Sequence, residues 1–203
     1  SASLIWRMHI YGDIVPRAPW EELIELAAPA AANPGPPFRD AHAALAFTAA
    51  GDDASFAKLV CGLQAMADKG DSCAKEATLP LVMGVRAFGN GDYLEAARLM
   101  GPVHHQLTRI GGSHAQRQVF EDTLLEAYLR AEQFDQATAL LRERLGRRET
   151  PRDTYWLARA QVGSGHAAAA QLSLKQAKAG WERADADTPE FTEVTRMSEI
   201  LDK

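Results

Sequence analysis

Residues 110–120 concentrate the side chains most suited to chemistry, because a glycine pair there precedes Ser, His, Ala, Gln and Arg. Gly111 or Gly112 can adopt the left-handed backbone conformation that ends a helix. Ser113 then suits the N-cap of the next helix, and Gln116, three residues later, suits the second position of a capping box. The segment therefore predicts a junction between two helices whose polar groups bond to backbone.

Arg117 is the residue of this segment that capping does not explain. At 100° per residue, Gln116 falls within the apolar stripe of the following helix and Arg117 falls at its edge. A charge at that edge needs a partner, because an unpaired buried charge is costly. We expect Arg117 either to join an internal ion pair or to bind a ligand, with His114 and Gln116 as neighbouring candidate binding residues.

Asp40 and His42 form a second polar pair, directly after the proline-rich stretch 33–37. Asp40 is a natural N-cap for a helix that begins there. His42 is either a histidine at the edge of the core, bonded to backbone, or a binding residue. Arg7, beside Trp6, is a third polar group near an apolar face. Asp40 and His42 complete the set of candidate binding residues.

No catalytic set is expected from the motifs. Ser113 has no nucleophile-elbow pattern, and the glycine pair lacks the preceding strand and downstream lysine of a phosphate loop. His104 and His105 are neighbours on a predicted helix and should diverge by 100°, whereas a metal needs converging ligands. Cys61 and Cys73 have no metal-ligand spacing around them. We therefore expect no catalytic residue, no metal and no cofactor.

Charge and hydropathy exclude two classes of partner. The net charge of -5 and the pI near 5.7 argue against binding to nucleic acid, which requires a basic surface. No apolar run approaches the ~18 residues of a membrane span. A reduced, cytoplasmic setting fits the two cysteines. The chain starts at Ser1, without an initiator methionine, and we expect it to be a piece of a longer protein.

The elements that must position these residues are helices. The chain is 46% apolar and only 7% aromatic, alanine is abundant, and no period-2 run of β-branched and aromatic residues persists. The spacing of apolar residues predicts helices at about 2–11 and 19–32, and then four helix pairs and a terminal helix: 40–50 with 54–69, 74–89 with 92–110, 113–131 with 134–148, 152–163 with 166–184, and 189–201.

A fixed internal spacing relates the four pairs. A small or apolar residue is followed seven positions later by a turn residue, and a buried-type residue stands five positions further on. The series are Ala44, Gly51, Phe56; Gly84, Gly91, Ala96; Leu125, Glu132, Ala137; and Ala158, Gly165, Ala170. A further step of four is always apolar, at Val60, Met100, Leu141 and Leu174. This pattern is typical of tetratricopeptide repeats.

The predicted architecture is all-α, an α-α superhelix of tetratricopeptide-like antiparallel helix pairs. We expect one helical-repeat domain over 1–203: an entry helix pair and proline-rich link at 1–37, four diverged repeats at 38–184, and a capping helix at 185–203. A terminal repeat needs such a cap because it must present a polar outer face.

Three segments resemble the tetratricopeptide repeat protein 38 family: Leu4-Ile5-Trp6-Arg7 ending at Gly12, Phe38-Arg39-Asp40-Ala41-His42, and the segment 110–120 with its Gly-Gly-Ser-His-Ala-Gln-Arg sequence. They follow one another in the order found in the C-terminal half of those proteins. Arg39 stands where family members carry Asn. The resemblance implies a helical-repeat fold and a missing, equally helical N-terminal half, and it implies no particular reaction.

Three functions are compatible with these observations. A repeat scaffold would bind a protein or peptide partner and catalyse nothing. A second possibility is one wall of a small-molecule or enzyme pocket completed by a missing N-terminal half, which would use the polar residues named above. A third is self-association. The scaffold is preferred because no catalytic set is expected from the motifs.

Overall fold

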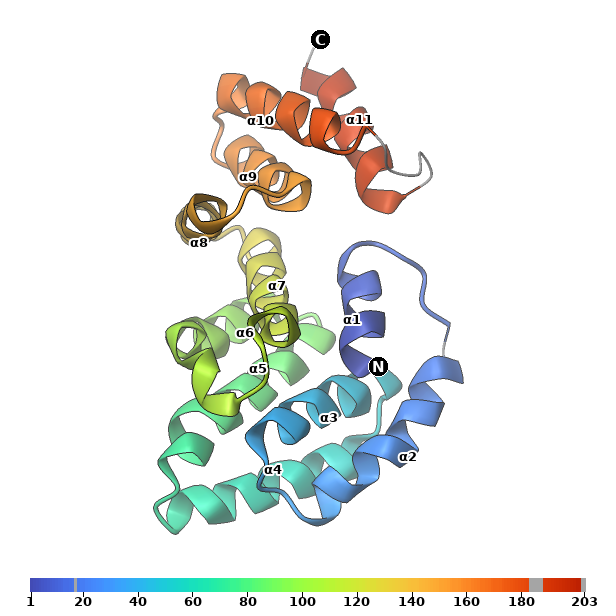
Figure 1. The fold of residues 1–203 in the computed structure, drawn as a ribbon, viewed down its shortest axis with the longest axis vertical. Helices are drawn as coiled ribbons and strands as arrows, with labels where there is room; N and C mark the ends of the chain where they lie inside the picture. Colours follow the sequence, from blue (N-terminus) through green and yellow to red (C-terminus); the bar gives the residue numbers. More distant parts are fainter. Residues whose placement is uncertain (17, 183–187, 202–203) are drawn as a thin grey trace. The chain divides into compact units, whose positions relative to one another are not determined.

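The computed structural model describes residues 1–16, 18–182 and 188–201, and within these residues the chain is helical without any β-strand (Figure 1). This confirms the all-α prediction. The elements are α1 (Ala2–Ile10), α2 (Ala18–Ala32), α3 (Pro37–Ala50), α4 (Asp53–Asp68), the π-helical turn η1 (Ala74–Thr78), α5 (Leu79–Gly89), α6 (Tyr93–Met100), the 3-10 helix η2 (Gly101–Ile110), α7 (His114–Arg130), α8 (Phe134–Arg147), α9 (Pro151–Gly163), α10 (Ala167–Gly180) and α11 (Pro189–Leu201). The predicted helix end at 183–184 and the predicted boundary at 184/185 lie outside the described residues.

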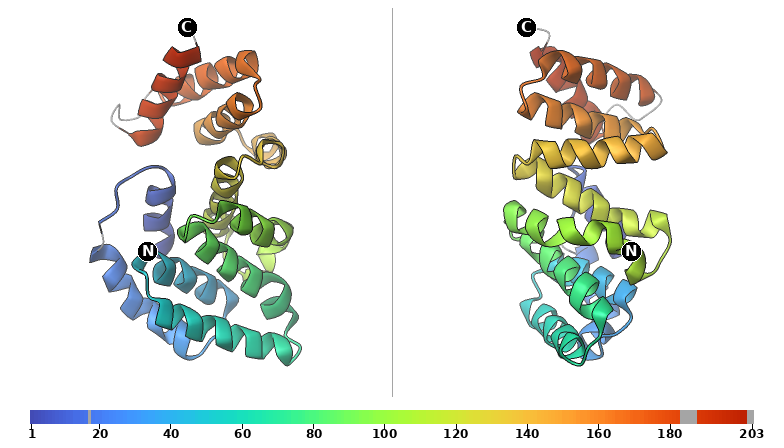
Figure 2. Two further views of the ribbon diagram at one scale, coloured as in Figure 1. Left: turned by 180° about the vertical axis from the view of Figure 1, so that it is seen from behind. Right: turned by 90° about the vertical axis from the view of Figure 1, so that its left-hand side faces the viewer.

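The chain divides into two compact units, Ser1–Ala127 and Tyr128–Lys203, with the division inside α7. In the first unit, α3 is the central helix and packs against α1, α2, α4 and α5, most extensively against α2 (Figure 2). Eight of its residues are buried: four alanines together with Asp40, Leu45, Phe47 and Thr48. Such small side chains allow helices to approach on all sides of α3.

Helices α8 to α11 pack in chain order in the second unit, so that α9 lies between α8 and α10. Trp156 is almost wholly buried on α9. Arg144 of α8 pairs with Asp153 of α9 at 2.9 Å, and both side chains are about 95% buried. Arg152 of α9 pairs with Glu190 at 2.7 Å, which joins α11 to this stack.

The four predicted turns share one geometry. Gly51, Gly91, Glu132 and Gly165 have φ of 73°, 80°, 56° and 76°. At each turn the next residue donates its N–H to the carbonyl five positions back, for example from Asp52 to the Phe47 carbonyl at 2.9 Å and from Gln133 to the Tyr128 carbonyl at 2.8 Å. These are the bonds of a Schellman helix end. Glu132 is the one non-glycine residue with positive φ among the described residues, so the degenerate copy keeps the turn without its glycine.

Helix α5 shows what a small residue does at the first position of one of these series. A Cβ added to Gly84 would lie 2.3 Å from Cγ of Met100, the last position of the same series. Gly84 therefore lets α5 and α6 cross closely. All four residues at the first step and all four at the third step are buried.

Three predicted helices differ in the structure. Residues 74–89, predicted as one helix, form the π-helical turn η1 followed by α5. Helix α3 begins at Pro37 with Pro36 as its N-cap, so Asp40 lies inside the first turn and is not the N-cap. Proline suits the first helical position because its fixed φ is helical and its missing N–H has no acceptor there. The predicted helix 92–110 is α6 followed by η2, because Pro102 removes a donor that a continuous α-helix requires.

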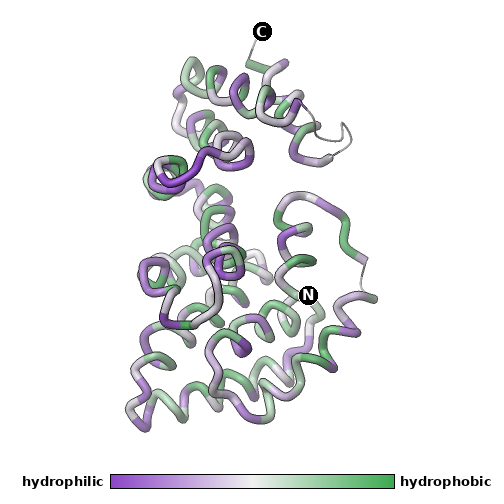
Figure 3. Tube along the Cα trace, viewed as in Figure 1, coloured by the Kyte–Doolittle hydropathy of each residue, from purple (hydrophilic) through white to green (hydrophobic). Residues whose placement is uncertain are grey.

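Apolar and polar residues alternate along the helices, as the tube in Figure 3 shows. In the described part of the chain, none of the helices has the length and apolarity needed to cross a membrane.

Candidate functional site

Two of the three segments that carry the family resemblance, 38–42 and 110–120, meet in the first unit at the ring of Phe38. The Phe38 ring lies against the His42 imidazole with ring centroids 4.1 Å apart, and His42 meets Phe120 of α7 edge to face at 5.2 Å. A Cβ added to Gly112 would come within 2.3 Å of Phe38 Cε2. Phe38 thus connects α3 to the glycine pair and, through His42, to α7.

Asp40 fastens the proline-rich link to α3. Its side chain is fully buried and accepts a hydrogen bond from the Gly35 N–H at 2.7 Å and others from Arg39 at 3.1–3.2 Å. Arg39 also donates to the Asn33 carbonyl. Burial raises the pKa of Asp40, and the bonds from Gly35 and Arg39 partly oppose that rise. The carboxylate therefore bonds backward across the link, in place of the predicted N-cap bond.

His42 is the backbone-bonded histidine that one of the two sequence hypotheses described. Its Nδ1 lies 2.8 Å from the Phe38 carbonyl oxygen. A carbonyl can only accept, so Nδ1 donates, and the neutral ring keeps its lone pair on Nε2. Burial lowers the pKa of His42, the bond to Phe38 partly offsets this, and the positive charge of Arg7 lowers the pKa further.

Arg7 belongs to a network that sequence reasoning identified only in part. Its guanidinium donates to the Ala115 carbonyl at 2.6 Å and lies 3.7 Å from the buried Asp122 carboxylate. Tyr11 donates its hydroxyl to Asp122 at 2.7 Å. Neither Tyr11 nor Asp122 was a candidate, because the apolar spacing of residues 119–127 placed Asp122 on the polar side of the helix. No local signal marks a pairing between residues more than a hundred positions apart.

The tryptophan beside Arg7 anchors α1. Trp6 is 1% exposed, packs against the rings of Trp20 and Phe88, and donates its indole N–H to the Thr123 hydroxyl at 2.9 Å. Thr123 in turn donates to the Val119 carbonyl at 2.7 Å. These contacts hold Arg7 at its position between α1 and α7.

The capping box is confirmed. The Ser113 N–H donates to Gln116 Oε1 at 2.8 Å, and the Gln116 N–H donates to the Ser113 hydroxyl at 3.3 Å. Gln116 is exposed, so its predicted place in the apolar stripe is wrong, since its amide turns back toward the helix N-terminus to form the cap. His114, the first residue of α7, is also exposed.

Arg117 donates to the carbonyl oxygens of Gly111, at 3.2 Å, and of Gly112. Its internal partners are thus backbone carbonyls at the end of η2, and its side chain is half-buried. Both glycines have positive φ, which turns these carbonyls toward the first turn of α7. The candidate residues Asp40, His42, Gln116 and Arg117 therefore all make bonds inside this unit.

Replacing Ser113 and Gln116 together by alanine should lower the free energy of unfolding by about 1–2 kcal/mol, because two N-terminal N–H groups of α7 lose their acceptors. Urea denaturation of the double variant and the wild type measures this. The control is Gln64→Ala at an exposed position of α4, which removes one side-chain bond to Asp68 and no cap. Equal midpoints for the double variant and wild type would contradict the capping role.

Replacing Arg117 by alanine should cost about 1 kcal/mol, because its carbonyl partners lie at the surface and water can replace the guanidinium. A buried ion pair would cost about 3 kcal/mol or more. Thermal and urea denaturation give the difference, with the exposed Arg98→Ala as control. A stability equal to or above that of the wild type would instead indicate that Arg117 is held for a ligand.

His42 should make the fold less stable as the pH falls. Its folded pKa is below the unfolded value of about 6.5, so the unfolded chain takes up a proton first. The loss should begin near that value and grow until the folded His42 is protonated. The measurement is the urea midpoint of wild type and His42→Gln between about pH 8 and pH 5. The difference between the two proteins cancels the other titrating groups, Asp40 included, and a pH-independent difference would contradict the prediction.

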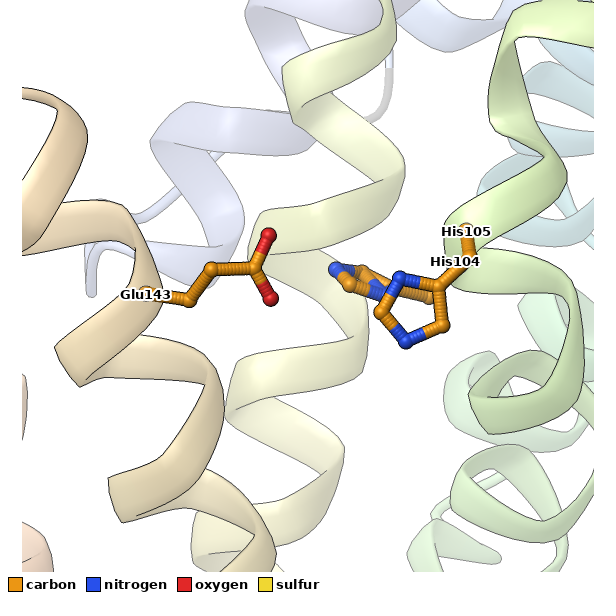
Figure 4. A group of neighbouring side chains, drawn as sticks. All are labelled: His104, His105 and Glu143. Carbon is orange, nitrogen blue, oxygen red and sulfur yellow. The ribbon is translucent and has the colours of Figure 1, made fainter.

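His104 and His105 contact each other on η2, with ring centroids 4.2 Å apart at 74° (Figure 4). The prediction that these side chains diverge is therefore wrong for the rings, because rotation about the side-chain bonds brings them together. Glu143, also drawn in Figure 4, belongs to α8 of the second unit. Two imidazoles are fewer than the three or four protein ligands of a zinc site.

Among the described residues of the first unit, these contacts bond the proline-rich link 33–37, the glycine pair and the helices α1, α3 and α7 to one another. Compared with known proteins, the chain matches no protein-family model, and no solved structure matches it.

Proposed function

We propose that the chain is a scaffold of diverged tetratricopeptide-like repeats that binds a protein or peptide partner and catalyses no reaction of its own. The observation that carries this proposal is the shared geometry of the four helix–turn–helix copies, down to the same backbone bonds at each turn. Repeated helix pairs of this kind expose long helix faces, which suit extended or helical partners.

The bonds of the candidate polar residues support the same proposal. Asp40 is engaged by Gly35 and Arg39, and Arg117 is engaged by the glycine pair. A pocket for a small molecule would instead need such groups to be directed into a common opening. The resemblance to the tetratricopeptide repeat protein 38 family agrees with a repeat scaffold.

A random-peptide library displayed on phage tests the proposal. The immobilised chain should enrich peptides that bind the folded protein and not the same protein unfolded in urea. Binding should have a dissociation constant of about 1–100 μM, the range of small peptide interfaces. If repeated selections yield no peptide specific to the folded chain, the scaffold function is wrong.

A further inference from the structure

Helix α4 carries an exposed groove that the site around Phe38 does not use. The groove has a volume of about 620 Å³ and runs between α4 and α5. Its lining includes three small residues of α4, here called the floor: Ala57, Cys61 and Ala65. The apolar residues Phe56 and Val60 of α4 and Met83 of α5 also line it. All of its lining residues belong to the first unit, on α4, the second helix of a predicted repeat, and on α5. Figure 1 shows these two helices.

The floor is unusually smooth for a surface helix. Its three small residues are four positions apart, so they form one line along α4, and all three are exposed. Gln64 is the long polar side chain of the lining, and it donates to Asp68 at 2.8 Å, which holds it along α4. The backbone of another helix could therefore approach α4 along the three small residues. Met83 of α5 adds apolar surface to the groove, since it is 40% exposed.

The charge within the lining of the groove is negative. Asp68 is the charged residue among those that line the groove, and it stands at the C-terminal end of α4. Asp53, with a side chain 78% exposed, stands at the N-terminal end, where it pairs with Arg86. Positive charge lies nearby, because Arg86 sits over the Phe56 ring at 5.0 Å. Lys58 and Lys69 are also exposed on α4, but at 100° per residue they point about 80–100° away from Asp68.

The first unit as a whole is also acidic. Ser1–Ala127 contains fifteen acidic and ten basic residues, so it carries the whole net charge of -5. An approaching cation is attracted to such a surface and an approaching anion is repelled. The complementary occupant of the groove is therefore apolar on one face and basic at its end.

We propose that this groove binds an amphipathic helix of a partner protein, with its apolar face on the floor and a lysine or arginine beside Asp68. The lined stretch from Phe56 to Asp68 corresponds to about 18 Å of helix, or roughly three turns of the occupant. This proposal rests on the scaffold function and identifies its partner.

Two synthetic helical peptides test it, each with leucines at i, i+3, i+4 and i+7, one with lysine and one with glutamate at the remaining positions. Fluorescence anisotropy should show the lysine peptide binding at least about ten-fold more tightly than the glutamate peptide. Bound peptide should slow alkylation of exposed Cys61 by iodoacetamide, with half-buried Cys73 as the internal reference. Equal binding of the two peptides overturns the proposal.

Three variants locate the binding. Ala65→Arg places a long cation on the floor and should weaken the lysine peptide at least about ten-fold. Leu94→Arg is the matched control, because Leu94 is 62% exposed on α6, outside the groove, and it should leave affinity unchanged. Asp68→Lys should reverse the preference between the peptides. If Ala65→Arg and Leu94→Arg have the same effect, the groove is not the site.

The remaining outcomes separate this proposal from the scaffold function. Phage-selected peptides that bind Ala65→Arg as well as wild type would overturn the groove and leave the scaffold standing. A wild-type dimer in sedimentation that Ala65→Arg dissociates would assign the groove to a second copy of the chain and overturn the proposal of a basic helix.

Discussion

Replacing Gly112 by alanine should lower the free energy of unfolding of the first unit by about 3 kcal/mol. A non-glycine residue at its φ of 75° costs about 1 kcal/mol. The added Cβ would also meet three carbons of the Phe38 ring between 2.3 and 3.3 Å away, and forcing a ring out of a packed position costs about 1–3 kcal/mol. Urea denaturation followed by the fluorescence of Trp6 and Trp20 measures the loss.

Gly51→Ala is the control for this prediction. Its φ of 73° is nearly the same, but no atom lies within 4 Å of the added Cβ, so only the backbone term remains. Gly51→Ala should therefore cost about 1 kcal/mol. In a double-mutant cycle with Phe38→Ala, the two losses should fall short of additive by about 1–2 kcal/mol. Equal losses for the two glycine variants would mean that Phe38 does not restrain the loop.

Replacing Arg144 by alanine should destabilise the second unit by about 3–5 kcal/mol. The pair with Asp153 is about 95% buried on both sides, and removal of the cation leaves the carboxylate in the interior. The double variant Arg144→Met with Asp153→Leu should be less destabilised than the single one, because it removes both charges and keeps most of the volume. The fluorescence of Trp156 and Trp181 reports on unfolding of this unit.

The exposed pair of Arg98 with Glu95 is the control for Arg144. It has similar short distances, but its side chains are 66% and 38% exposed. Arg98→Ala should therefore leave the urea midpoint almost unchanged, because water screens an exposed pair. If Arg144→Ala cost no more than Arg98→Ala, the burial of the Arg144 pair would carry no energetic weight.

Local features of the fold could be predicted from sequence, because they depend on residues within one or two helical turns. The four turns and the Ser113 cap are of this kind: glycine, serine and glutamine act on backbone a few positions away. The interruption at Pro102 was missed, although it too is local, because the apolar spacing of 92–110 continues through it.

The candidate site was predictable only in part. The polar residues of the three segments were identified, but the partner of Arg7 was not, since Asp122 lies 115 positions away and on the side of α7 that periodicity assigns to solvent. The role of Asp40 was also missed. It depends on α3 beginning three residues earlier than the proline run suggested, which directs the carboxylate back to Gly35.

Two kinds of glycine in this chain, at open turns and at helix crossings, should diverge at different speeds over evolutionary time. A turn glycine such as Gly91 has open space around it, and Glu132 shows that another side chain can occupy the equivalent position at a cost of about 1 kcal/mol. Gly163 is different, because an added Cβ would fall within 2.5 Å of three carbons of the Phe134 ring. A turn glycine can therefore be replaced at a small cost in stability, whereas a glycine at a helix crossing cannot be replaced without moving the neighbouring ring. A search for distant relatives should weight the places where helices touch above the places where the chain reverses.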